Sequence, residues 1–97
     1  MEVQENNIDV YTLENCKACE ILLNNLQAMV NEFETNTDIK INVNVFEVKS
    51  KDVSKLKNSN IKDFPTTVFK HKVQVLDSIC GSVSKLKLYY KLMKTFV

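Results

Sequence analysis

The spacing of apolar residues divides the chain into segments with strand-like and helix-like patterns. Ile8 to Leu13 is short, β-branched and apolar, which predicts a buried strand. From Cys16 to about Phe33, apolar residues recur with the helical period and predict an amphipathic helix packed on a sheet. The residues in this stripe are Cys19, Leu22, Leu23, Leu26, Met29, Val30 and Phe33. From Ile39 to Val48, apolar residues alternate with lysine and asparagine, which predicts a strand with at least one covered face.

The sequence pattern in the second half of the chain predicts shorter helices and strands. Residues 50–60 are typical of a short helix with Ser50 as its N-cap and with Val53 and Leu56 facing inward. After Pro65, residues 66–70 and 73–79 predict two strands joined by a tight turn at 70–72. Residues 82–96 predict a closing helix, whose apolar stripe consists of Val83, Leu86, Tyr90 and Met93.

These elements follow one another in the order β-α-β-α-β-β-α. The first strand, helix and second strand predict a right-handed parallel crossover, and the last two strands predict an antiparallel hairpin. We therefore expect an α/β fold with a four-stranded mixed sheet and helices on both faces. The whole chain, 1–97, is predicted to be a single domain, with residues 1–7 as a polar N-terminal extension.

Composition and charge limit the classes of binding partner that we expect for this chain. The formal net charge is only +1 and the 13 basic residues are all lysines, so we expect no nucleic-acid partner. The polar N-terminus has no signal-peptide pattern, and no apolar run is long enough to cross a bilayer. We expect a cytoplasmic monomer that does not bind membranes.

The stretch LENCKACE places Cys16 and Cys19 with two residues between them, just where the first helix is predicted to begin. In a chain without an export signal, this spacing suggests redox or metal chemistry, although two small core residues would also fit. A closed zinc site needs four ligands, and the available ones are Cys16, Cys19, Cys80 and His71. We expect His71 to be a turn residue at the far end of the sheet, so we predict no metal.

The chemistry of the pair can be argued from its position. Cys16 would lie at a helix N-terminus beside Lys17, and both favour the thiolate that attacks disulfides, so we predict a pKa below about 8.5. Glu14, Glu20 and Asp63 would oppose this shift. Cys19 lies three residues on, with a Cα–Cα distance of roughly 5–6 Å, inside the range that a disulfide permits. We expect it to be buried and to act as the resolving thiol.

Three features together resemble the thioredoxin and glutaredoxin superfamily over about residues 8–96. They are the cysteine pair at a strand–helix junction, the stretch FPTTVFK, and the stretch GSVSKLKLYYKLM after the hairpin. The resemblance implies a glutaredoxin-sized thioredoxin-like fold in which Pro65 forms a cis peptide bond and faces the cysteines. It also implies that the loop at Cys80 and Gly81 lies opposite them.

The sequence also departs from these families. Asn15 stands where thioredoxins have tryptophan, and Val10 stands where they have a buried acid. Glutaredoxins would have a basic residue at Leu13 and Thr-Val at Asp63 and Phe64. Glutathione recognition is therefore unsupported, and the subfamily stays open.

These observations predict a thiol–disulfide oxidoreductase that acts on protein disulfides. Cys16 is the expected nucleophile and Cys19 the resolving thiol, and the expected contacts to the partner are Lys17, Phe64, Pro65, Cys80 and Gly81. Cys80 could instead be a small apolar residue that ends a strand. No cofactor is expected besides the redox-active disulfide, and the electron donor, a reductase or glutathione, is not specified. The alternatives are a non-catalytic adaptor with a redox latch and a glutathione-dependent glutaredoxin.

Overall fold

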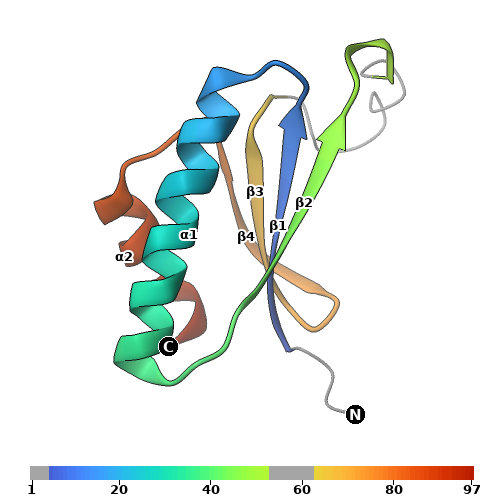
Figure 1. Cartoon of the computed structure of the whole chain (residues 1–97). Coiled ribbons are helices and arrows are strands. Elements are labelled where there is room, and N and C mark those ends of the chain that lie inside the picture. Colours follow the sequence, from blue (N-terminus) through green and yellow to red (C-terminus); the bar gives the residue numbers. More distant parts are fainter. Residues whose placement is uncertain (1–4, 53–62) are drawn as a thin grey trace.

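The structure is a computed structural model of the chain, and it describes residues 5–52 and 63–97. The described elements are β1 (Asn6–Leu13), α1 (Lys17–Thr37), β2 (Asn42–Val48), β3 (Thr66–His71), β4 (Gln74–Cys80) and α2 (Lys85–Phe96). The four strands form one sheet in the order β2-β1-β3-β4, as Figure 1 shows. Strand β1 is parallel to β2 and antiparallel to β3, and β4 is antiparallel to β3. The predicted α/β fold class and mixed sheet are confirmed.

The predicted short helix over residues 50–60 falls largely outside the described residues. Of this segment, only residues 50–52 are described, and they form a single 3₁₀ turn. The backbone N–H of Ser50 donates to the Glu14 carboxylate at 2.7 Å. This bond joins the start of the segment to the turn that follows β1.

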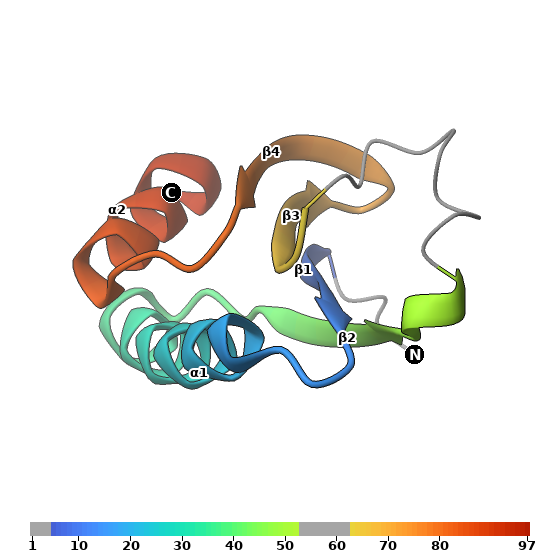
Figure 2. The same cartoon turned by 90° about the horizontal axis from the view of Figure 1, so that it is seen from above.

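Both described helices cover the same face of the sheet (Figure 2). Helices were predicted on both faces, and within residues 5–52 and 63–97 no helix covers the second face. Between the described helices and the sheet lies the core, which is formed by Ile8, Val10, Leu22, Leu26, Val30, Phe33, Ile41, Phe69, Ile79, Leu88 and Leu92. In the described part of the chain, neither helix is long and apolar enough to cross a membrane.

Helix α1 confirms the stripe that its sequence predicts. Its buried residues are Cys19, Leu22, Leu26, Val30 and Phe33. The helix ends where Asp38 adopts the left-handed conformation, with φ of 62°, and donates its N–H to the Glu34 carbonyl at 3.0 Å. This backbone arrangement closes the last turn of a helix.

Helix α2 buries a different face from the one that its sequence predicted. Leu88 and Leu92 are fully buried, whereas the predicted core residues Leu86 and Tyr90 are 81% and 62% exposed. The helix carries two apolar stripes, and its contacts with other elements select between them. The Tyr89 ring meets the Phe33 ring edge-on at 6.3 Å, and the Phe96 ring lies 6.2 Å from that of Phe69.

Three strand boundaries also differ from the prediction. Strand β1 begins at Asn6, inside the predicted N-terminal extension, and β2 begins at Asn42, three residues after the predicted Ile39. The hairpin turn lies at residues 72–73, where Lys72 has a positive φ of 56°. His71 is therefore the last residue of β3, not a turn residue, and its Nδ1 lies 3.0 Å from Asn6 Oδ1.

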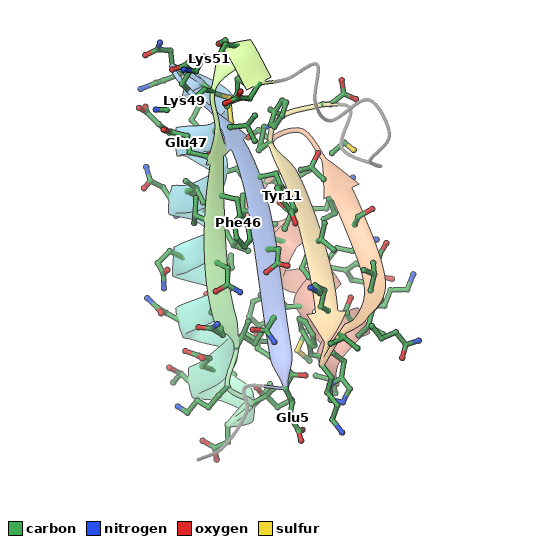
Figure 3. The ribbon with its side chains drawn as sticks, turned by 90° about the vertical axis from the view of Figure 1, so that its right-hand side faces the viewer. Glu5, Tyr11, Phe46, Glu47, Lys49 and Lys51 are labelled. Atoms are coloured by element: carbon green, nitrogen blue, oxygen red, sulfur yellow. A yellow bond between two sulfur atoms is a disulfide. The ribbon has the colours of Figure 1, made fainter. Side chains whose placement is uncertain are left out.

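The sheet face away from the helices is polar at its centre and aromatic toward one end (Figure 3). Asp9, 7% exposed, pairs with Lys70 Nζ at 3.1 Å and accepts a hydrogen bond from Asn44 at 3.0 Å. The rings of Tyr11 and Phe46 stack with centroids 5.2 Å apart. An ion pair thus satisfies the buried carboxylate on this face.

Candidate active site

The two cysteines lie at the N-terminus of α1 and form a disulfide, with Cα atoms 5.2 Å apart. Cys16 is the N-cap residue, and its Sγ accepts the backbone N–H of Cys19 at 3.1 Å. Cys16 is half-buried, whereas Cys19 is only 3% exposed. The predicted spacing and the predicted contrast in exposure are both confirmed.

A two-residue turn carries the chain from β1 to Cys16. Asn15 adopts a left-handed backbone conformation with φ of 57°, and Glu14 donates its N–H to the Val48 carbonyl at 3.1 Å. Asparagine tolerates this conformation better than most residues, because its short polar side chain can bond locally. The sequence showed Asn15 only as a departure from thioredoxins. Its turn propensity was the signal that could have revealed this role.

The charges around the pair do not uniformly favour a thiolate at Cys16. Lys17 Nζ lies 3.4 Å from the Glu20 carboxylate, so the predicted benefit of Lys17 to a Cys16 thiolate is partly offset. The hydrogen bond from the Ser50 backbone holds the pKa of Glu14 below its ordinary value. Glu14 therefore stays ionised near the cysteines over a wide pH range, as a charge that opposes the thiolate.

Pro65 and Gly81 lie at the same end of the sheet as the disulfide. The register pairs Tyr11 with Thr66 and Thr66 with Cys80, so the start of β3 and the end of β4 adjoin the end of β1 (Figure 1). The peptide bond before Pro65 is cis, as the resemblance implied. Gly81 donates its N–H to the Pro65 carbonyl at 2.7 Å. The loops before β3 and after β4 are thereby joined at the end of the sheet where the cysteines lie.

The remaining predicted contact residues differ in exposure. Phe64 is half-buried and Pro65 is buried, while the Lys17 side chain is 84% exposed. Gly81 has φ of +82°, a conformation that favours glycine, and the space where a Cβ would lie is open. Cys80 ends β4 as an exposed free thiol.

The structure separates the ligands that a zinc site would have required. His71 pairs with Asn6 at the start of β1, whereas Cys16 follows the end of that strand. Eight strand residues extend over about 25 Å, too far for one ion to bind both. Within residues 5–52 and 63–97, no group of three or more histidine, cysteine, aspartate or glutamate residues could hold a metal ion.

No protein-family model and no curated protein sequence matches this chain. Solved structures do match. Thioredoxin-2 of the malaria parasite aligns with a TM-score of 0.71 and 16% identity, covering 93% of this chain and 82% of that one. Thioredoxin of Aeropyrum pernix gives 0.68 at 15% identity, covering 96% and 77%, and that of Malassezia sympodialis gives 0.67 at 17% identity, covering 95% and 76%. The chain has the thioredoxin fold.

The position of the cysteine pair was predicted from the sequence, but a cleft beside the pair was not. This cleft of about 180 Å³ lies between the first turns of α1 and the ends of β1 and β2. The residues that line it include Thr12, Cys16, Cys19, Glu20, Leu23 and Glu47. Glu47 is far from the cysteines in sequence. It lines the same cleft because β2 pairs with β1 in the register that sets it opposite Thr12.

Proposed function

We propose that this protein is a thiol–disulfide oxidoreductase that reduces or exchanges disulfides in other proteins. The observation that carries the proposal is the Cys16–Cys19 disulfide at the N-terminus of α1, in which Cys16 is half-buried and Cys19 is buried. Helix N-termini stabilise anions through unpaired N–H groups and the helix dipole. The arrangement favours a reactive thiolate at Cys16.

In the reducing direction, the Cys16 thiolate attacks one sulfur of the substrate disulfide. A mixed disulfide forms, the substrate disulfide breaks, and the leaving sulfur takes a proton from water. Cys19 then loses its proton and attacks Cys16, which forms the intramolecular disulfide and releases the second substrate sulfur. Two electrons pass from the dithiol to the substrate, and a thiol reductant must restore the dithiol.

The loops around Pro65 and Gly81 are the proposed contact surface for the substrate. Phe64 would offer backbone groups to an extended peptide, as a sheet edge does, and Lys17 and Cys80 would flank it. We propose protein disulfides as substrates, no cofactor beyond the cysteine pair, and a reductase or glutathione as donor. A monomer in a reducing cytoplasm is part of the same proposal.

The test is the reduction of a disulfide-bonded protein with dithiothreitol as the electron source. The wild type should exceed dithiothreitol alone by about tenfold or more, and Cys16→Ser should fall to background. Cys80→Ser makes the same chemical change at an exposed cysteine of the proposed contact surface and should lower the activity far less than Cys16→Ser, because Cys80 takes no part in the sulfur exchange. If wild type and Cys16→Ser both match background, the adaptor with a redox latch becomes the better function.

A trapping experiment identifies the substrate class. Cys19→Ser should leave the mixed disulfide on Cys16 unresolved, and mass spectrometry would identify what is attached. Turnover of a glutathione mixed disulfide by Cys19→Ser would support the glutaredoxin alternative instead, because such turnover needs only the first cysteine.

A further inference from the structure

The buried position of Cys19 creates a chemical requirement that rests on the proposed function. Cys19 must lose its proton before it can attack the mixed disulfide, because the thiolate is the nucleophile. With an exposure of 3%, its sulfur is shielded from bulk water, and burial disfavours the ionised form. A proton acceptor close to Cys19 would therefore speed this step.

The core beneath the pair does not offer this acceptor at the position where thioredoxins have a buried acid. That position is Val10, which is apolar and fully buried. Its neighbour Asp9 is buried, but successive strand residues point to opposite faces of the sheet. Its carboxylate is bound to Lys70 and Asn44 on the face away from the helices.

The cleft beside the disulfide provides a different route for the proton. Cys19 lines this cleft together with Thr12 and Glu47, and the cleft opens to solvent. Its volume of about 180 Å³ and its polar lining suit ordered water. The Glu47 carboxylate lies opposite Thr12 in the strand register and is fixed by Lys49 at 2.8 Å (Figure 3).

We propose that Glu47 accepts the proton of Cys19 through water in the cleft. The S–H proton passes to a water molecule, and that water gives a proton to the Glu47 carboxylate. The Cys19 sulfur then bonds to Cys16, the mixed disulfide breaks, and the substrate sulfur leaves and is protonated. Glu47 finally loses its proton to solvent, so no further reactant is consumed.

Glu20 is the competing carboxylate, because it also lines the cleft. Both carboxylates are exposed and paired: the Glu20 side chain is 69% exposed and lies 3.4 Å from Lys17 Nζ, and that of Glu47 is 54% exposed and lies 2.8 Å from Lys49 Nζ. Glu47 approaches from β2, on the sheet side of the cleft with Thr12. We therefore assign the acceptor role to Glu47 and use Glu20 as the matched control.

The experiment measures the two chemical steps separately in single-turnover reactions from about pH 5 to pH 9. Formation of the mixed disulfide is followed in the Cys19→Ser background, and its resolution is followed in protein that retains both cysteines. Glu47→Gln should slow resolution at neutral pH by about tenfold or more, while the formation rate changes by no more than about twofold. Its resolution rate should also depend more steeply on pH than the wild-type rate, because only water or hydroxide would then take the proton of Cys19.

Two further variants test whether the loss of rate is specific to the Glu47 carboxylate. Glu20→Gln should resolve at the wild-type rate, and Glu47→Asp should recover part of the lost rate with a wild-type-shaped pH profile. Equal resolution by Glu47→Gln and wild type, or equal losses in Glu47→Gln and Glu20→Gln, would overturn the assignment. Failure of the wild type to form any mixed disulfide would instead refute the proposed function. Matching unfolding curves exclude misfolding as the cause.

Discussion

The first turns of α1 and α2 have the same backbone arrangement but different capping atoms. At α2, the Ser84 hydroxyl accepts the N–H of Lys87 at 3.2 Å, and at α1 the Cys16 sulfur accepts the N–H of Cys19 at 3.1 Å. Both cap residues have extended backbones. A hydroxyl in this place only stabilises the helix, whereas a sulfur can also ionise and attack a disulfide. The comparison indicates that the active site modifies an ordinary helix cap.

The largest effect on activity should come from replacing the Cys16 cap of α1 with serine, the residue that caps α2. Cys16→Ser should lose disulfide reduction down to background, because a serine hydroxyl stays protonated. Under reducing conditions its free energy of unfolding should stay within about 1 kcal/mol of wild type, since serine is a preferred N-cap. Activity assays and urea unfolding in dithiothreitol measure the two effects. A variant that is inactive because it is unfolded would contradict the proposed equivalence of the caps.

The next largest effect is a difference in stability between substitutions on the buried and exposed faces of α2. Leu88→Ala should lower the free energy of unfolding by about 2–5 kcal/mol, because it opens a cavity in the core. Leu86→Ala makes the same change at an exposed position and should alter it by no more than about 0.5 kcal/mol. Denaturant titrations of the two variants compare them directly. Similar losses in both would mean that α2 does not bury the face described here.

The two helices also differ in how far their sequences predict their packing. In α1 a single apolar stripe runs from Cys19 to Phe33, so spacing alone identified the buried face. In α2, Leu86 and Tyr90 form one stripe and Leu88 and Leu92 form another. Local spacing cannot choose between them, because the choice depends on contacts with α1 and the sheet.

The candidate site shows the same limit. The cysteine pair and Pro65 are recognisable because each carries a local motif. Glu47 carries none, and its place in the cleft follows from strand pairing with Thr12. The alternation in β2 is a weak guide to facing, since Val45, predicted to be covered, is 51% exposed. The sequence therefore predicted the reactive sulfurs but not the carboxylate beside them.

A smaller effect on stability should come from removing the Ser84 cap of α2, which takes no part in the proposed reaction. Ser84→Ala should lower the free energy of unfolding by about 1 kcal/mol, because the Lys87 N–H loses its side-chain acceptor. Disulfide reduction should be unchanged, since α2 contributes no residue to the cysteine pair. Cys16→Ala, measured in the same way, should lose both the cap and the activity. A drop in activity for Ser84→Ala would show that the two helix starts are coupled.

The smallest effect concerns the ion pairs that accompany the two helices. Lys17 and Glu20 pair within the first turn of α1, whereas Lys91 of α2 reaches across to Asp77 of β4 at 2.6 Å. The hydrogen bond from Lys91, and then that from the Ser78 N–H, hold the pKa of Asp77 below its ordinary value of 3.8. A carboxyl whose pKa is lower in the folded state stabilises it above the unfolded pKa, and this stabilisation disappears as the pH falls through the folded value.

Asp77→Asn should therefore be less stable than wild type by about 0–1 kcal/mol at neutral pH, because the pair is partly exposed and screened by solvent. This difference should shrink as the pH is lowered below 3.8, where the wild-type carboxyl also becomes protonated. Glu20→Gln should show almost no difference at either pH, because both partners of its pair are exposed and belong to the same helical turn. Urea unfolding at several pH values measures this. A difference for Asp77→Asn that stays constant or grows in acid would mean that the Lys91 pair does not hold α2 to the sheet, and that packing by Leu88 and Leu92 fixes this helix alone.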